Sequence, residues 1–130
     1  MAVGLASAIA NSILNALCRN TAWTQPAAFW VKLHIGDPGA AGALNAAANT
    51  TRKQATFSAA ASGAITNSAD VAWTAVSTTE TYSHVSFWDA STAGNFLGSD
   101  DLAAAVAVTA GDDFTIAAGN LDLSLTPVAA

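Results

Sequence analysis

Two histidines and two aspartates are the residues of this sequence whose types could do chemistry. His34 lies in the stretch FWVKLHIGDPG, just before Asp37, and His84 lies in SHVSFWD, just before Asp89. Imidazole and carboxylate groups together bind zinc and other transition metals. No two of these ligands are two or four residues apart, so a metal site would depend on the pairing of distant strands. We therefore favour the alternative, in which both histidines are exposed or interface residues of strands.

The other reactive groups form no recognisable catalytic pattern. The sequence has no G-x-S-x-G motif for a nucleophilic serine, and Cys18 ends an apolar segment, where a thiolate is disfavoured. The pairs at 100–101 and 112–113 are aspartates in turn-like segments, where Asp is expected for backbone reasons. They lack the ordered spacing of a calcium loop. We expect no enzymatic activity and no cofactor or metal.

The charges exclude one class of partner. The formal net charge is -5, and the four cations are too few and too scattered to neutralise a run of phosphates. They are Arg19, Lys32, Arg52 and Lys53. Direct nucleic-acid binding is therefore not expected. Asn11, Ser12 and Asn15 interrupt the first apolar stretch, so we expect no membrane span, and no cation precedes that stretch as in a signal peptide.

The positions of these groups depend on one helix and a series of strands. Leu5, Ile9, Ile13 and Leu17 recur every four residues and predict an amphipathic helix near Val3 to Cys18, with outer limits 2–18. We expect this helix to cover one end of a sheet, in preference to docking on a neighbour. Apolar and polar residues then alternate from Phe29 to Ile35, which predicts a half-buried strand that ends in a turn at Asp37-Pro38-Gly39.

The remaining chain predicts short strands separated by turns. Residues 36–51 are rich in Gly, Ala and Asn and predict a long surface loop. Strands are predicted at 54–58, 64–67, 71–74, 79–88, 96–98, 103–108 and 114–116, with a closing strand around Leu121, Leu123 and Leu125. Residues 89–95 should close one hairpin, and 109–113 should join 103–108 to 114–116 in another.

This order predicts a mainly β protein with one N-terminal helix. We expect a single domain of residues 1–130, in which residues 28–126 form an antiparallel β-sandwich or a flattened, jelly-roll-like barrel. The composition suits contact with other protein, because 52% of the residues are hydrophobic and only 10% are charged. We therefore predict interface residues on the strand faces opposite the core. The candidates are Trp30, Trp88, Tyr82, His34, His84 and Asp37.

Several segments, taken in order, resemble a known protein family. They are MAVGLASAIANSILNALC, FWVKLHIGDPGAAG, NTTRKQATF, SHVSFWDASTAGNFLGS and VTAGDDFTIAAGNLDLSL. Together they are similar to small structural proteins of tailed bacteriophages, especially phages of actinobacterial hosts, which are labelled tail fibre, minor tail or head decoration proteins. The resemblance implies a β-rich, non-enzymatic virion component, made in the cytoplasm of the host bacterium and located on the capsid surface or the tail.

Three functions are compatible with these features. The first expectation is a capsid decoration or minor capsid protein, which binds the outer head shell in many copies and stabilises it. The alternative is a tail fibre or minor tail (tail-tip) protein involved in host contact. A carbohydrate-binding module is a second alternative, which rests on the tryptophans. In the first two cases the partners are the major capsid protein or other virion proteins, and we expect a homo-oligomer.

Overall fold

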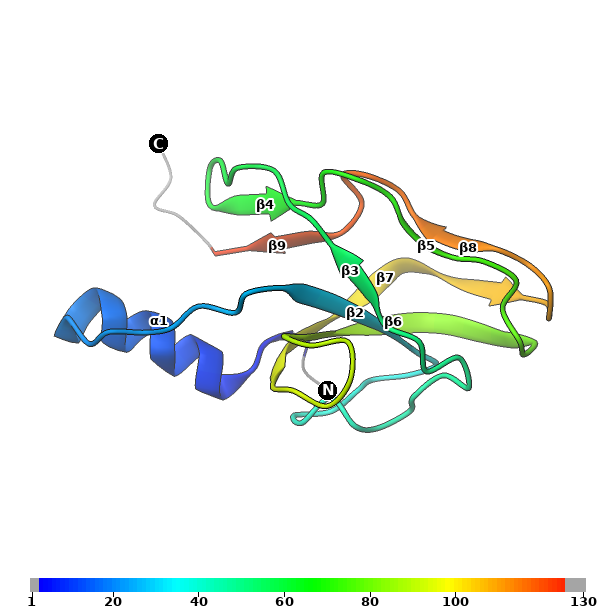
Figure 1. The fold of residues 1–130 in the computed structure, drawn as a ribbon, viewed down its shortest axis with the longest axis horizontal. Coiled ribbons are helices and arrows are strands. Elements are labelled where there is room, and N and C mark those ends of the chain that lie inside the picture. Colours follow the sequence, from blue (N-terminus) through cyan, green and yellow to red (C-terminus); the bar gives the residue numbers. More distant parts are fainter. Residues whose placement is uncertain (1–2, 126–130) are drawn as a thin grey trace.

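The computed structural model describes residues 3–125, which form one helix and nine strands (Figure 1). In chain order the elements are β1 (Gly4–Leu5), α1 (Ser7–Arg19), β2 (Phe29–His34), β3 (Lys53–Ala55), β4 (Ala64–Thr66), β5 (Val71–Trp73), β6 (Glu80–Trp88), β7 (Phe96–Val108), β8 (Phe114–Ile116) and β9 (Asp122–Ser124). The predicted start of the helix at residue 2 and the predicted end of the sandwich at residue 126 lie outside the described residues. No helix within 3–125 has the length and apolar character needed to cross a bilayer.

The strands form two layers. Within the described residues, β1-β7-β6-β2-β3 make one five-stranded sheet, called the main sheet below, and every strand pair in it is antiparallel. Two ribbons, β4-β9 and β5-β8, are also antiparallel and lie together over one face of the main sheet (Figure 1). No barrel closes in this region. The structure thus confirms the mainly β, antiparallel, sandwich-like prediction.

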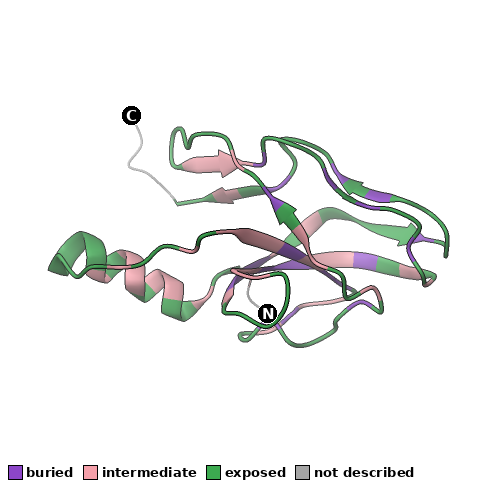
Figure 2. Cartoon of the chain, in the orientation of Figure 1, coloured by how far each residue is buried: buried purple, intermediate pink, exposed green. Residues whose placement is uncertain are grey.

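The core fills the space between the main sheet and the ribbons. Val31 and Leu33 of β2 and Val85 of β6 are fully buried, as the alternation in those strands predicts. The ribbon side contributes Trp73 and Phe114, whose ring centroids are 5.8 Å apart. Figure 2 shows the buried residues concentrated between these two layers.

The helix differs from the prediction in its position. Residues 4–5 are a strand and not the first turn of the helix, because they pair with Ser99 and Gly98 of β7. The helix ends at Arg19, and Asn20 after it adopts the left-handed conformation typical of a C-terminal cap. The helix α1 is described in full and contains no buried residue, and Ile9 is its residue that packs on the core. The expectation that it covers one end of the sheet is wrong, since α1 projects from the end of the main sheet (Figure 1).

One predicted hairpin is also wrong. The separate strands predicted at 96–98 and 103–108 are one strand, β7, and β8 pairs with β5 instead of β7. After β7 the chain crosses to the second layer, where the backbone of buried Val76 exchanges two hydrogen bonds with Asp112 and Gly111. The turn residues therefore end β7 as predicted but direct the chain to another layer. The hairpin closed by residues 89–95 is confirmed by the β6-β7 pairing.

The loop between β2 and β3 is ordered against the main sheet. It lies on the side opposite the ribbons (Figure 1), and part of it continues the sheet through backbone bonds of Ile35 and Leu33 to Asn45 and Ala47. Gly42 is buried at φ +68°, and a Cβ there would lie 2.4 Å from the Phe96 ring. The predicted loop is confirmed, but it covers a sheet face that the sequence analysis left exposed.

Candidate contact surfaces

His34 is buried in a chain of hydrogen bonds under the β2-β3 loop. Its Nδ1 donates to the Leu44 carbonyl at 2.8 Å, so its Nε2 accepts from the Ser86 hydroxyl at 2.7 Å. Trp88 Nε1 donates to the same Ser86 oxygen at 2.8 Å. Burial lowers the pKa of His34, chiefly by desolvating the charged form, which favours the neutral ring. The expectation of an exposed His34 is wrong, because the loop that follows its strand folds back over it.

His84 is the register partner of His34, so the two histidine strands do pair. The His84 Nδ1 lies 2.8 Å from the hydroxyl of Ser83. Within residues 3–125, no three His, Cys, Asp or Glu side chains gather in a way that could hold a metal ion. The pairing of strands thus brings the imidazoles together without the carboxylates.

The two aspartates near the strand ends stabilise loops. Asp37 Oδ1 accepts from the Gly39 amide at 2.9 Å, which is the turn predicted from Asp-Pro-Gly. Asp89 Oδ1 accepts from the backbone amide of Asn95 at 2.7 Å, and its Oδ2 accepts from the Asn95 side chain at 2.8 Å. These bonds, the backbone one foremost, lower the pKa of Asp89. Both carboxylates hold their loops closed.

Arg52 fastens the loop between β6 and β7 to the edge of the main sheet. Its Nη1 donates to the carbonyls of Ala90 and Ala93 at 2.8 and 2.7 Å, and its guanidinium carbon lies 4.2 Å from the centre of the Trp88 ring. Phe96 packs on Trp88 with the ring centroids 5.5 Å apart. No local pattern predicts this contact, because Arg52 and Trp88 are far apart in the chain. Arg52 therefore stabilises the fold, and its guanidinium is not freely solvated.

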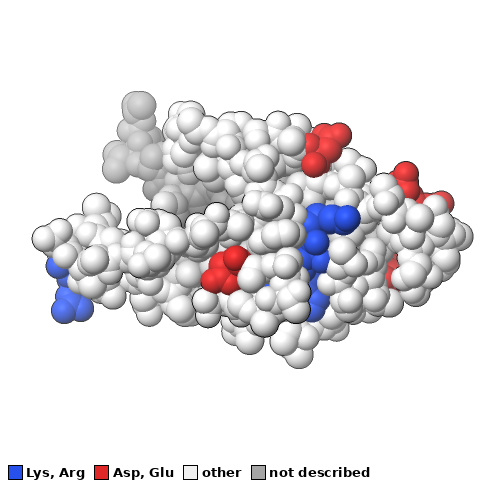
Figure 3. Space-filling view, viewed as in Figure 1, with Lys and Arg blue, Asp and Glu red and all other residues white. Residues whose placement is uncertain are grey.

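Trp30 lies beside Trp88 on the outer face of the main sheet. The two are register partners in β2 and β6, and both are half-buried. Lys32 follows on the same face, and its pKa is lowered by burial and, to a smaller extent, by the charge of Arg52. Figure 3 shows one basic patch near the centre of this view and a second basic group at its left end, with most of the remaining surface uncharged.

Tyr82 is in the core and not at the surface. Its ring contacts Phe114 at 5.1 Å, so Tyr82 faces β8 as Val85 does, although these two residues are three apart. The register of β6 with β7 shifts between Tyr82 and His84, and this irregularity breaks the alternation on which the sequence analysis depended. Among the described residues the Tyr82 hydroxyl has no hydrogen-bond partner. Burial, and then the charge of Glu80, raise the pKa of Tyr82.

The six interface candidates therefore form two groups, one buried and one half-buried. His34 and Tyr82 are fully buried and could contact a partner only if the fold opened. Trp30, Trp88, His84 and Asp37 are half-buried and remain predicted contact residues.

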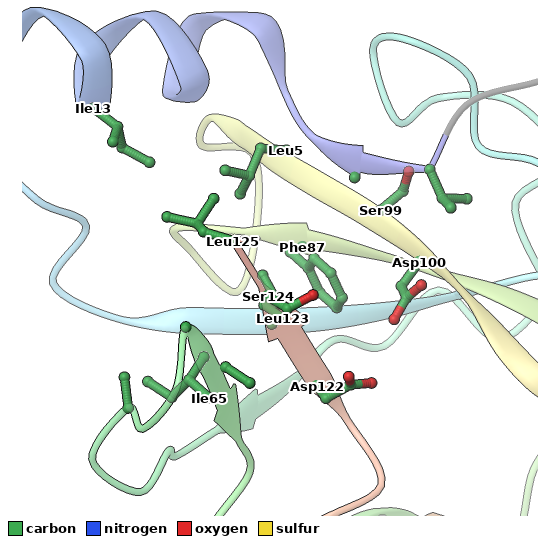
Figure 4. A pocket seen from close by; sticks show the side chains of 15 residues that line it. Leu5, Ile13, Ile65, Phe87, Ser99, Asp100, Asp122, Leu123, Ser124 and Leu125 are labelled. Atoms are coloured by element: carbon green, nitrogen blue, oxygen red, sulfur yellow. The ribbon is translucent and has the colours of Figure 1, made fainter. Parts of the chain in front are cut away.

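A second surface, which the sequence analysis missed, is an apolar groove of about 510 Å³ where α1 leaves the main sheet. Its lining residues come from β1, α1, β4, β6, β7 and β9 (Figure 4). The labelled apolar side chains are Leu5, Ile13, Ile65, Phe87, Leu123 and Leu125. Two carboxylates, those of Asp100 and Asp122, also line it, and burial raises the pKa of Asp100. The leucines of the predicted helix, which are exposed in the structure, were the signal in the sequence for an apolar surface here. We expected the face that they share to pack on the sheet.

These features define a small β-rich module with two candidate contact surfaces. Comparison with protein-family models gives a match over residues 4–124 to the family described as Podophage GP4 fiber I protein gp80. The match spans well over half of the chain, and the chain belongs to this family. No curated protein matched the sequence. The resemblance to phage structural proteins is thus confirmed, and the family places the chain among virion structural proteins.

Proposed function

We propose that this protein is a non-enzymatic subunit of a phage tail fibre, where it binds other virion proteins and further copies of itself. The observation that carries the proposal is the match of residues 4–124 to a phage fibre family. The description of that family favours the tail-fibre alternative over capsid decoration, which was the first expectation from the sequence.

The use of the polar groups supports a structural function. A catalytic or ligand-binding group needs an atom that is free to meet a substrate. The nitrogens of His34 are both engaged in internal hydrogen bonds, and the carboxylates of Asp37 and Asp89 are bonded to their own loops. Three of the four groups that first suggested chemistry thus stabilise the fold.

The same surroundings argue against a sugar-binding platform at Trp88. Sugars stack on a free aromatic face, whereas Arg52 and Phe96 both pack on Trp88. Trp30 lies on the same face, and no aromatic ring or cation among the described residues packs on it. We therefore propose that Trp30 contacts another virion protein.

The position in the virion can be tested by labelling. A phage that carries an epitope on this chain is imaged by electron microscopy with a gold-labelled antibody. Gold at the tail in a small number of copies is expected. Gold spread over the head would refute the fibre assignment in favour of decoration.

The contact role of Trp30 is tested with Trp30→Ala. We expect a larger loss of incorporation into virions than of thermal stability, because Trp30 is only half-buried. Trp73→Ala is the matched control, since Trp73 is 1% exposed and its truncation should cost about 3–5 kcal/mol of folding free energy. If Trp30→Ala lowers the melting temperature as much as Trp73→Ala does, Trp30 is a core residue and the contact role is wrong.

A further inference from the structure

The helix α1 lacks the packing that normally stabilises a helix of its length. It has 13 residues and is therefore about 20 Å long, and isolated helices shorter than about 12–15 residues are marginal in water. None of its residues is buried (Figure 2), and its contact with the core is through Ile9. Leu14 and Leu17 are exposed, Leu17 to 78%. A second surface is needed to cover this apolar face.

The groove beside α1 is apolar, as the exposed face of the helix is. Ile13 of α1 forms part of its wall, and Leu5 and Leu125, both exposed, stand opposite (Figure 4). The free face of the helix and the groove are therefore continuous. Their combined surface is apolar, as is a surface that receives the apolar face of a helix.

The charges of the two surfaces are complementary. The helix carries one charged residue, Arg19 in its last turn, and the groove carries Asp100 and Asp122. Within one copy, Arg19 lies six residues beyond Ile13, the helix residue that lines the groove, and the helix leads away from β1 (Figure 1). A second helix that runs antiparallel to the first would bring its own Arg19 back to the groove, and the opposed helix dipoles would also be favourable.

We propose that α1 of a second copy of this chain lies antiparallel against α1 and fills this groove, so that two copies form a twofold pair. The contact is isologous, because each copy gives a helix and receives one. Each Arg19 then faces Asp100 and Asp122 of the other copy, and each Leu17 is removed from water. The inference deepens the proposed function, on which it rests for the idea that this chain contacts copies of itself.

The pairing is tested with the purified full chain by sedimentation velocity and light scattering over a wide range of concentrations. Wild-type protein should show a reversible equilibrium between one and two chains. Leu17→Asp should raise the dissociation constant at least roughly a hundredfold, because the twofold contact contains two copies of each side chain. Leu44→Asp is the matched control, since Leu44 is 62% exposed but lies in the β2-β3 loop, and it should leave the equilibrium unchanged.

The orientation is tested by exchanging charges. Arg19→Asp and Asp122→Arg should each weaken the pairing by roughly tenfold, and the double variant should recover most of the loss. Circular dichroism should show that all these variants keep the wild-type fold, because the changed residues are exposed. A wild-type chain that stays monomeric, a species of three chains, or a double variant that recovers nothing would overturn the proposal.

These results are separate from the test of the proposed function. A chain found at the tail but monomeric in solution overturns the pairing alone. A chain that pairs as described but is found over the head overturns the fibre assignment alone.

Discussion

Mild acid should destabilise this protein through His34. The ring is fully buried, and its two nitrogens are bonded to the Leu44 carbonyl and the Ser86 hydroxyl. Protonation would add a hydrogen to Nε2, which could then no longer accept from the Ser86 hydroxyl. It would also place a positive charge on a desolvated ring. Desolvation is the largest cause of the lowered pKa of His34 in the folded state, and the charge of Lys32 lowers it further.

The sign and size of the effect follow from linkage. Because the folded pKa lies below the ordinary value of 6.5, the unfolded chain takes up the proton first as the pH falls. Stability is full above pH 6.5 and is lost as the pH falls from there toward the folded pKa. Between about pH 7.5 and about pH 5.5 the free energy of unfolding should fall by at most about 1.4 kcal/mol.

Urea unfolding followed by tryptophan fluorescence at the two pH values measures this difference. In His34→Gln the side-chain amide keeps a donor and an acceptor but cannot be protonated in this pH range. We expect the variant to be less stable than the wild type and to lack the part of the pH dependence that belongs to His34. His84→Gln is the control that keeps His34. The raised pKa of Asp100 acts with the opposite sign, but it is common to all three proteins and cancels in the comparison. An equal loss of free energy in wild type and His34→Gln would refute a neutral, buried His34.

Three further substitutions test other contacts. Arg52→Ala should lower the free energy of unfolding by about 1–2 kcal/mol and speed hydrogen exchange in residues 89–95, whereas unchanged exchange would mean that Arg52 does not hold this loop. Gly98→Ala would place a Cβ 2.5 Å from the Gly4 carbonyl, so it should detach β1 and reduce helical circular dichroism, and an unchanged spectrum would contradict this pairing. Tyr82→Phe removes a buried hydroxyl that has no partner among the described residues, so unfolding experiments should show equal stability or a gain of up to about 1 kcal/mol. A clear loss would show that the hydroxyl is satisfied.

The sequence predicted the strands well where local pattern decides them. The alternation in β2 places Val31 and Leu33 in the core, as observed, because a strand's side chains point to alternate faces whatever it pairs with. The Asp37–Gly39 bond of the Asp-Pro-Gly turn and the Asp89–Asn95 bonds that close the next loop also join residues near each other in the chain. In each case the physical cause lies within a few residues of the effect.

The candidate site was predicted less well, because its residues are set by contacts between distant segments. His34 was expected to be exposed since nothing in its strand shows that residues near Leu44 return to cover it. Tyr82 was assigned to the outer face because the register shift near Ser83 has no local signature. The helix was recognised from its period, but a period shows only that one face is apolar and not what covers that face.

The groove follows from the unequal lengths of the two layers. Each strand of the ribbons has three residues and spans about 10 Å, whereas β7 has 13 residues and could extend about 40 Å. The ribbons therefore cannot cover the whole main sheet, and β1 and α1 meet it where the cover ends. Phe87 is 1% exposed but still lines the groove, so its truncation should affect folding and assembly together. Leu17 and Leu125 are exposed and are not part of the described core, so these are the positions where we expect that assembly can be changed while the fold stays intact.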